Sequence, residues 1–266
     1  MKGLLAAGAL MLILSISLKS QISQPAETLS TKKLIRDFFE TAMNYPEKSI
    51  EAKEEGKVLV GLTVSKTGTC NNFYIIKGVS PALDAEAMRL SKKILWKPAF
   101  ENGQPVDTEV TLEVPFNIKH YKRRKGLSAT SELIFNPNLM DTSGVIYIFA
   151  QLESRPKLLL NDKYRNLTNY ISEILIYPET AKTAGIQGTV KLDFVIEEDG
   201  NTSNIRVANS VGGGCDQEAI RILQSIRWMP GLKDEKQVRC SSTFEVTFLL
   251  SDKKQQNIPN RQSGGL

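Results

Sequence analysis

The chain offers few side chains that could catalyse a reaction. Its single histidine, His120, lies in a basic run that extends from Lys119 to Lys125. This position excludes a Ser-His-Asp or Cys-His arrangement and a histidine metal site. No nucleophile, base and orienting group can be named together, so we expect no enzyme, no cofactor and no bound metal.

Acidic residues recur at matching positions near the start of two predicted helices. They are Asp84 and Glu86 in one helix, and Asp216 and Glu218 in the other. Carboxylates in a first helical turn complement the positive end of the helix dipole. We therefore interpret these residues as helix-stabilising rather than catalytic.

An internal duplication organises the chain around these helices. With a shift of 132 residues and no gaps, residues 45–116 match residues 177–248 at 21 of 72 positions. The matches include two Tyr-Pro-Glu steps, turn glycines, the acids above and a Trp-x-Pro step. Such positions mark where elements start and stop, as expected of two copies that keep one fold.

Each copy has the periodicity of an α+β unit. Strictly alternating apolar residues mark a half-buried strand at 58–64 and again at 190–196. Apolar residues spaced three and four apart mark a helix at 83–94 and again at 215–226. The predicted order in each copy is helix, helix, strand, strand, helix, strand. We expect two tandem units, each a three-stranded antiparallel sheet with helices on one face.

Aromatic residues sit at matching places in both copies. Trp96 and Trp228 each lie at the end of a predicted helix, shortly before a proline, and this shared place favours core anchors over ligand-stacking residues. Tyr45 and Tyr177 leave two readings open, because each ring could pack beneath a helix start or contact a partner.

The N-terminus bears on the compartment. After Lys2, residues 3–18 are apolar, which is short for a membrane span of about 20 residues and typical of a secretory signal peptide. We expect cleavage after Ser20 and a periplasmic chain. The alternative is an inner-membrane protein anchored by residues 3–18.

The remaining chain divides by composition. We expect a signal peptide at 1–20, a first domain at 31–120, a linker at 121–144, a second domain at 145–250 and a disordered tail at 251–266. The β-rich run 145–150 could add a strand to the second domain. The net charge of +5 is mild, and an exported chain is a poor candidate for binding nucleic acid.

Two of the three cysteines face the same predicted layer. Cys215 lies on the inward stripe of its helix, and Cys240 shares its parity with inward strand residues. Export permits oxidation, so we predict a disulfide between Cys215 and Cys240, with two buried free thiols as the alternative. Cys70 is expected to stay unpaired, because its parity is opposite to that of Phe73 and Ile75.

A series of spaced signals carries a family resemblance. The second copy contains Tyr177-Pro-Glu, AGIQGTV from Ala184, Glu-Asp-Gly from Glu198, GGGCDQEAIRIL from Gly212 and Trp-Met-Pro from Trp228. This pattern resembles the C-terminal domain of TonB, the energy-transducing protein of Gram-negative envelopes. The first copy resembles the same domain, but its signals at turns and element boundaries are weaker. The resemblance covers roughly 35–118 and 145–250.

The resemblance implies binding rather than chemistry. Domains of this family capture a segment of a TonB-dependent outer-membrane receptor by adding it to the edge of the third strand, in support of energy-coupled transmembrane transport. Inner-membrane motor proteins are a further partner, and no small-molecule substrate is expected. The residues implied in partner binding are Tyr177, Pro178, Thr243, Glu245, Thr247 and Leu249.

Two departures from a full TonB keep an alternative open. Only Pro25 and Pro46 lie between the N-terminal segment and the first copy, so the chain lacks the proline-rich spacer that provides reach. The domain is also doubled. The alternative is an envelope scaffold or peptidoglycan-associated module without energy transduction.

The two copies differ at one edge position. The third strand of the first copy carries Pro115, which has no N–H to donate, where the second copy has Thr247. We therefore expect the second copy to bind a receptor segment and the first copy to bind it weakly or not at all.

Overall fold

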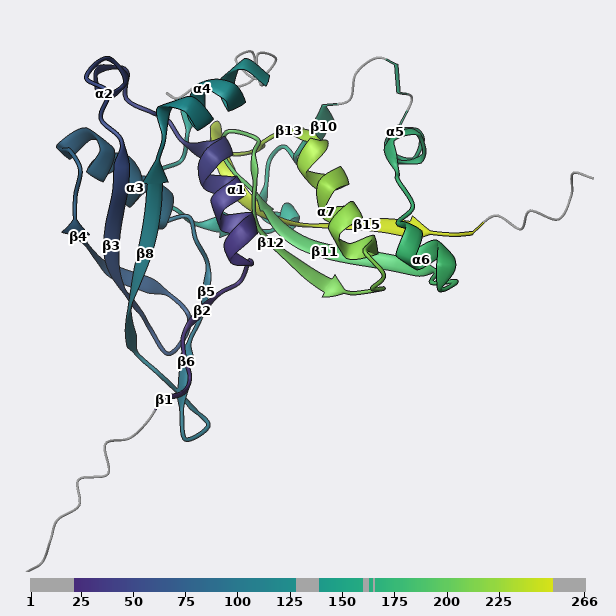
Figure 1. Ribbon diagram of the computed structural model, residues 1–266, viewed down its shortest axis with the longest axis horizontal. Helices are drawn as coiled ribbons and strands as arrows, with labels where there is room; N and C mark the ends of the chain where they lie inside the picture. The colour runs from purple at the N-terminus through teal and green to yellow at the C-terminus, as the bar shows by residue number, and fades with distance from the viewer. Residues whose placement is uncertain (1–21, 128–138, 160–162, 165, 251–266) are drawn as a thin grey trace, which may run out of the picture.

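The computed structural model describes residues 22–127, 139–159, 163–164 and 166–250, which form two α+β units (Figure 1). The predicted signal segment and tail lie outside these residues. The first unit contains α1 (Lys32–Ala42), α2 (Glu47–Glu51), β3 (Gly56–Val64), β4 (Cys70–Lys77), α3 (Pro81–Ser91) and β8 (Thr108–Phe116). The second repeats this order as α5 (Leu167–Ile174), α6 (Glu179–Thr183), β11 (Gly188–Ile196), β12 (Thr202–Asn209), α7 (Cys215–Ser225) and β15 (Lys236–Phe248). The predicted fold class and element order are confirmed.

The first sheet has the order β4-β3-β8 with antiparallel pairing throughout. Alternate residues of β3 point into a core that α1 and α3 complete, and the valines and leucine at 58, 60, 62 and 64 are fully buried. Trp96 packs against this core, as expected of an anchor. The other face of the sheet carries no described helix (Figure 1), as expected of a unit with helices on one face.

The second sheet is larger than predicted. Its order is β12-β11-β15-β14, where β14 (Gly231–Lys233) forms a hairpin with the start of β15. Strand β9 (Ile146–Tyr147) pairs in parallel with β15 at Arg239 and Cys240. The prediction that residues 145–150 add a strand to this unit is therefore confirmed. Trp228 is buried here against Phe194.

Short elements complete the two units. They are β1 (Ile22–Gln24), β2 (Glu27–Thr28), β5 (Trp96–Lys97), β6 (Ala99–Glu101), β7 (Gln104–Val106), η2 (Phe149–Gln151), β10 (Lys157–Leu159) and β13 (Arg227–Met229). Three small antiparallel sheets form from them: β1-β6-β7, β2-β5 and β10-β13.

The basic run after the first unit is a helix rather than the start of a linker. Helix α4 (Ile118–Leu127) follows β8 directly, and its Ile118 and Tyr121 pack against the first core. Arg124 forms an ion pair at 3.0 Å with Glu40 of α1. The sequence analysis placed the start of a linker at residue 121 and did not predict this helix, because Ile118 and Tyr121 are too few apolar residues to give a helical pattern among the basic ones.

A carboxylate-guanidinium pair holds the helices of each unit together. In the first unit Glu86 of α3 accepts the Asn44 N–H at 2.6 Å, and Arg89 donates to the Ala42 carbonyl at 2.6 Å. In the second unit Glu218 accepts from Ile176 and Arg221 donates to Ile174, also at 2.6 Å. These glutamates therefore fix the chain before each Tyr-Pro step, beyond the helix-dipole role that the sequence predicted.

Helix α1 lies between the two units (Figure 1) and joins their cores. Its Phe38 and Phe39 are buried in the first core, whereas Leu34 packs against the second. Ahead of the helix, the Ser30 hydroxyl donates to the Ile205 carbonyl of β12 at 2.9 Å. The first unit therefore covers part of the β12 edge.

Asn204 of β12 strengthens this joint. Its backbone has a φ of 49°, which marks a bulge in the strand and turns the side chain toward the first unit. The side-chain amide accepts from the Leu95 N–H at 2.8 Å and donates to the Lys93 carbonyl at 2.9 Å. Asn204 thus pairs with the backbone of the first unit as a neighbouring strand would.

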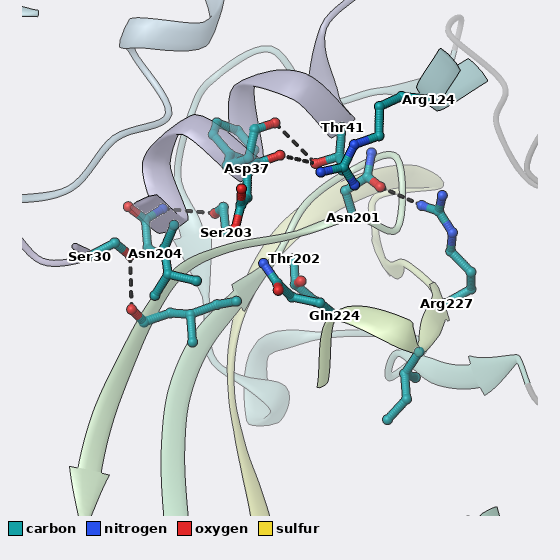
Figure 2. Close-up of a pocket in the computed structure, with 14 residues that line it drawn as sticks. Ser30, Asp37, Thr41, Arg124, Asn201, Thr202, Ser203, Asn204, Gln224 and Arg227 are labelled. Carbon is teal, nitrogen blue, oxygen red and sulfur yellow. Dashed lines mark hydrogen bonds between the residues drawn. The ribbon is translucent and has the colours of Figure 1, made fainter. Parts of the chain in front are cut away.

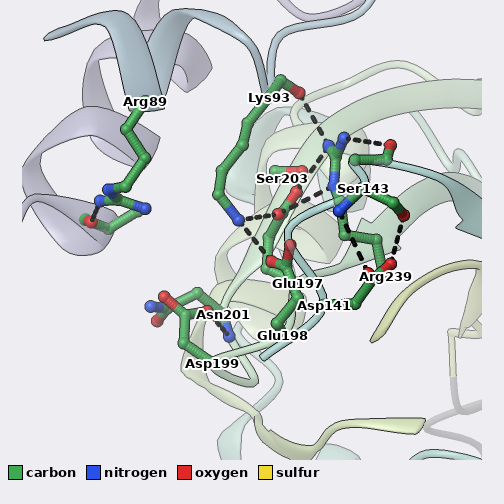
Figure 3. Close-up of polar contacts among 12 residues, drawn as sticks. Arg89, Lys93, Asp141, Ser143, Glu197, Glu198, Asp199, Asn201, Ser203 and Arg239 are labelled. Carbon is green, nitrogen blue, oxygen red and sulfur yellow. Dashed lines mark hydrogen bonds and ion pairs between the residues drawn. The ribbon is translucent and has the colours of Figure 1, made fainter. Parts of the chain in front are cut away.

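A buried ionic cluster closes the joint (Figure 3). Glu197, which has no exposed surface, accepts two hydrogen bonds from Arg239 at 3.0 and 2.9 Å and one from Lys93 at 2.7 Å. Lys93 belongs to the first unit and also pairs with Glu198. Burial alone would raise the pKa of Glu197, but Arg239 and Lys93 outweigh it and lower this pKa to about 2.

Loss of the Glu197 charge should destabilise the chain strongly. Glu197→Gln leaves Lys93 and Arg239 buried with one carboxylate fewer, and removing one partner of a buried ion pair costs about 3–5 kcal/mol. The free energy of unfolding, measured in urea, should fall by that amount. The matched control is Glu179→Gln, which breaks an exposed pair with Lys182 and should cost at most about 1 kcal/mol. Equal effects of the two substitutions would contradict this account of the joint.

The same carboxylate should make stability depend on pH. Because the pKa of Glu197 is about 2 in the folded chain against an ordinary value of 4.5, its stabilisation is fully present above about pH 4.5 and is lost as the pH falls toward 2. The pKa of Glu198 is raised by burial, so that residue acts in the opposite direction. Wild type should lose more unfolding free energy between pH 4.5 and 2 than Glu197→Gln. Parallel pH profiles of the two proteins would rule out this role.

Candidate partner-binding edge

Along β15, the backbone N–H and C=O groups of successive residues point alternately toward β11 and away from it. One side-chain contact shows which residues point away from β11. Asn209 of β12 donates through its side chain to the Thr189 carbonyl at 2.6 Å. The backbone groups of Thr189 therefore face β12, and Thr189 lies opposite Thr247 in the β11–β15 register. Because Thr189 does not bond β15, the N–H and C=O of Thr247 point away from β11.

The first unit gives the same answer independently. Pro115 has no N–H, yet the pairing of β8 with β3 runs through Lys57 and Pro115 without a register shift. Pro115 therefore occupies a position where β8 donates nothing to β3. The equivalent residue of β15 is Thr247, so both observations direct the Thr247 N–H toward the free edge.

The open part of this edge has a defined length. Strand β9 occupies the edge at Arg239 and Cys240 and is held there in part by a hydrogen bond from Arg239 to the Gly144 carbonyl at 3.3 Å. From Ser241 to Phe248, no described strand pairs with β15 on the side opposite β11. The alternation leaves the backbone groups of Thr243, Glu245 and Thr247 unpaired along it.

The side chains of these three residues lie on the face that helices leave open. Thr243, Glu245 and Thr247 are exposed, whereas the intervening apolar residues are buried beneath α7. Thr247 is within hydrogen-bond distance of Thr189, 2.9 Å between the hydroxyls, and Glu245 pairs with Lys191 at 3.4 Å. Leu249, one residue beyond the strand, is 70% exposed. The structure thus brings four of the six predicted binding residues into one line.

Tyr177 and Pro178 lie at the end of this line rather than along it. The Tyr177 ring packs edge-on against Phe248 with centroids 5.6 Å apart, and its hydroxyl donates to the Ile186 carbonyl at 2.5 Å. Pro178 precedes α6 and contributes no side-chain cap. Burial, and then the nearby Cys215 sulfur, raise the pKa of Tyr177. The hydroxyl has a structural partner, so the exposed part of the ring is what a ligand could meet.

The predicted disulfide is wrong. Cys215 and Cys240 are both buried free thiols. Cys215 lies near Tyr177, at the Phe248 end of β15, whereas Cys240 lies eight residues back along the strand. At about 3.3 Å per residue, Cys240 is about 26 Å along the strand from Phe248, the residue on which Tyr177 packs, whereas a disulfide requires Cα atoms within about 7 Å. The sequence pattern predicted that both cysteines face the same core layer, but it did not predict where each lies along the strand.

Cys70 is also a free thiol, but it faces the first core rather than solvent. Asn72 has a φ of 50° and forms a bulge that shifts the pairing of β4 with β3. The bulge puts Cys70 on the same face as Phe73, which reverses the predicted parity. Burial raises the pKa of the Cys70 thiol to about 11.

A polar cavity of about 110 Å³ lies at the joint between the units (Figure 2). Asp37 and Thr41 of α1 line one side, and Asn201 and Arg227 of the second unit line the other. Its lining contains no cysteine or histidine. Within the described ranges, no group of three His, Cys, Asp or Glu side chains could hold a metal ion.

The sequence did not reveal two residues that shape the edge. Arg239 anchors the start of β15, and Asn209 fixes the direction of the Thr189 carbonyl. Arg239 shares the alternation of the exposed residues Thr243, Glu245 and Thr247, so the sequence pattern gave no signal that its side chain is buried. Among the described helices, none is long and apolar enough to cross a membrane.

Comparison with known proteins gives one family. The family described as Gram-negative bacterial TonB protein C-terminal matches residues 41–118 and 175–250, together more than half of the chain. The solution NMR structure of the Pseudomonas aeruginosa TonB CTD is 25% identical in sequence and has a TM-score of 0.28; the match covers 41% of this chain and 98% of that one. No curated protein matches the chain.

Proposed function

Because the chain belongs to the family of Gram-negative bacterial TonB protein C-terminal domains, which are transport-associated domains of the envelope, we propose that it captures an extended segment of an outer-membrane receptor. The captured segment adds as a strand to the β15 edge between Ser241 and Phe248. The observation that carries this proposal is the outward direction of the Thr247 backbone, with Thr243 and Glu245 in the same phase.

Strand addition suits an edge of this kind. Each outward residue offers one N–H and one C=O, so three residues offer six groups to an incoming backbone. Main-chain hydrogen bonds give affinity without regard to side chains, and the alternating exposed side chains of Thr243, Glu245 and Thr247 add selectivity. Strand β9 stops the added strand at the other end, because it already occupies Arg239 and Cys240.

The remaining edges support an assignment to the second unit. In the first unit, Pro115 removes the donor that corresponds to Thr247, and the bulge at Asn72 interrupts β4. In the second unit, Ser30 and the segment around Leu95 cover part of the β12 edge. Binding by the first unit should therefore be weak or absent.

The wider role concerns energy coupling at the envelope. A receptor held at β15 would be coupled to inner-membrane motor proteins if residues 3–18 anchor the chain, and a cleaved chain would bind receptors from the periplasm. An envelope scaffold without energy transduction is the second candidate, supported by the lack of a proline-rich spacer ahead of the first unit. Co-purification from the native envelope separates them: receptors together with motor proteins support transduction, whereas cell-wall fragments support the scaffold.

A proline at the edge should block binding more than an alanine does. Thr247→Pro removes the outward N–H, whereas Thr247→Ala retains it. The fold should survive, because the first unit holds Pro115 at the same register. For the full chain and synthetic peptides that cover the periplasmic N-terminal segments of receptors from the same bacterium, calorimetry should show at least about tenfold weaker binding for the proline variant, the equivalent of about 1.4 kcal/mol. The alanine variant should change binding less than about threefold.

The matched control places proline in the first unit. Thr111 of β8 is equivalent to Thr243 of β15, so Thr111→Pro should leave peptide binding unchanged and Thr243→Pro should weaken it. All variants are first shown to be folded by circular dichroism. Equal losses from Thr247→Pro and Thr247→Ala, or a loss from Thr111→Pro matching that from Thr243→Pro, would count against strand addition at β15.

A further inference from the structure

The two units differ at the place where the third strand ends. In the first unit, α4 follows β8, and the Tyr121 ring lies 5.3 Å from the Tyr45 ring (Figure 1 shows α4 at the end of β8). Tyr45 is only 5% exposed and also contacts Phe116 edge-on at 5.6 Å. In the second unit, Tyr177 makes the same contact with Phe248, but it is only partly buried. One face of the tyrosine is therefore covered in the first unit and uncovered among the described residues of the second.

The residues that cover Tyr45 have no equivalents at the matching positions of the second copy. With the shift of 132 residues, Tyr121 corresponds to Lys253, so the sequence after β15 lacks the aromatic residue. Glu40, which pairs with Arg124 and holds α4 on α1, corresponds to Ser172. The second copy thus lacks the residues for both the tyrosine ring contact and the ion pair that α4 makes in the first unit.

The residues beside this face have become apolar. Ile176 directly precedes Tyr177 and is 65% exposed, and Leu249 directly follows Phe248 and is 70% exposed. The matching residues of the first unit are Asn44 and Asn117. Each of the two rings in contact is thus next in sequence to a large exposed apolar side chain, which favours an apolar ligand at this position.

We propose that Tyr177, Ile176 and Leu249 form an anchor site for one large apolar or aromatic side chain of the segment captured at β15. Tyr121 on Tyr45 shows the geometry of such a contact within the same fold. The open edge of β15 leads directly to the site at Phe248, so the anchor residue lies at the end of the added strand opposite β9. This inference rests on the proposed strand addition.

An anchor is needed because backbone pairing alone binds weakly. Six hydrogen bonds to an edge give a modest net gain, and ordering a flexible peptide opposes it. Burial of one large apolar side chain should tighten binding by roughly tenfold to a hundredfold. The anchor therefore determines which extended segments are retained.

A random peptide library tests both levels of the proposal. The full chain is immobilised, and seven-residue peptides displayed on phage are selected on four proteins: wild type, Ile176→Asn with Leu249→Asn, Thr247→Pro, and Ile76→Asn. The asparagines copy the residues of the first unit at those positions. Ile76 is a large apolar residue of the first unit that is 48% exposed, and it serves as the control.

Wild type and Ile76→Asn should enrich peptides with a large apolar or aromatic residue at one fixed end. The double asparagine variant should still select peptides but without that preference, and the best wild-type peptide should bind it at least about tenfold more weakly. Replacing the anchor residue of that peptide by serine should weaken binding to wild type by the same factor as the two asparagine substitutions do. In the double asparagine variant, the same peptide change should weaken binding little further.

The outcomes separate the two proposals. Selected peptides that are lost with Thr247→Pro, yet show no end preference or keep it in the double asparagine variant, would overturn the anchor site and leave strand addition standing. Failure to select any peptide, or selection that is unaffected by Thr247→Pro, would overturn strand addition and the anchor site with it.

Discussion

Unpaired backbone groups at sheet edges are the constraint from which the arrangement of this chain follows. An open edge binds another strand unless something blocks it. Here the first unit covers part of β12, Pro115 removes a donor from β8, a bulge interrupts β4, and β9 covers the start of β15. The segment from Ser241 to Phe248 has no described partner strand on the side opposite β11, and it contains no proline, so it keeps every backbone donor.

The buried cluster at Glu197 holds this arrangement in place. Glu197 joins Arg239, at the start of β15, to Lys93 of the first unit. Buried ion pairs are costly to assemble, but they penalise the loss of one partner heavily. The first copy of the duplication thus supports the second, because its α1 and Lys93 contact the second unit. Its own β8 edge lacks one backbone donor at Pro115. Under the proposed strand addition, the duplication therefore gives one supporting and one binding unit rather than two equal binding sites.

Periodicity in the sequence predicted most of the fold. The alternation in β3 and β11, the apolar stripe of each sheet-facing helix and the Tyr-Pro-Glu steps predicted the element order. Pro115 led to the expectation, still a prediction, that the second copy is the one that binds. The alternation of residues along a strand did not predict how far along the strand a residue lies, which made the Cys215–Cys240 disulfide wrong. It also did not predict the bulge at Asn72, which reverses the direction of Cys70. The joint was also missed, because Lys93 and Glu197 resemble surface residues in a linear sequence, and their burial depends on contacts between residues about 100 positions apart.

Amide hydrogen exchange with and without a bound receptor peptide tests the central claim most directly. Val246 should be protected in both states, because its N–H already bonds β11. Thr243, Glu245 and Thr247 should exchange quickly in the free chain and slow by at least about tenfold when the peptide is bound, in alternation with their neighbours. Protection that appears instead along β8 or β4, or binding that leaves these three amides unchanged, would contradict strand addition at β15.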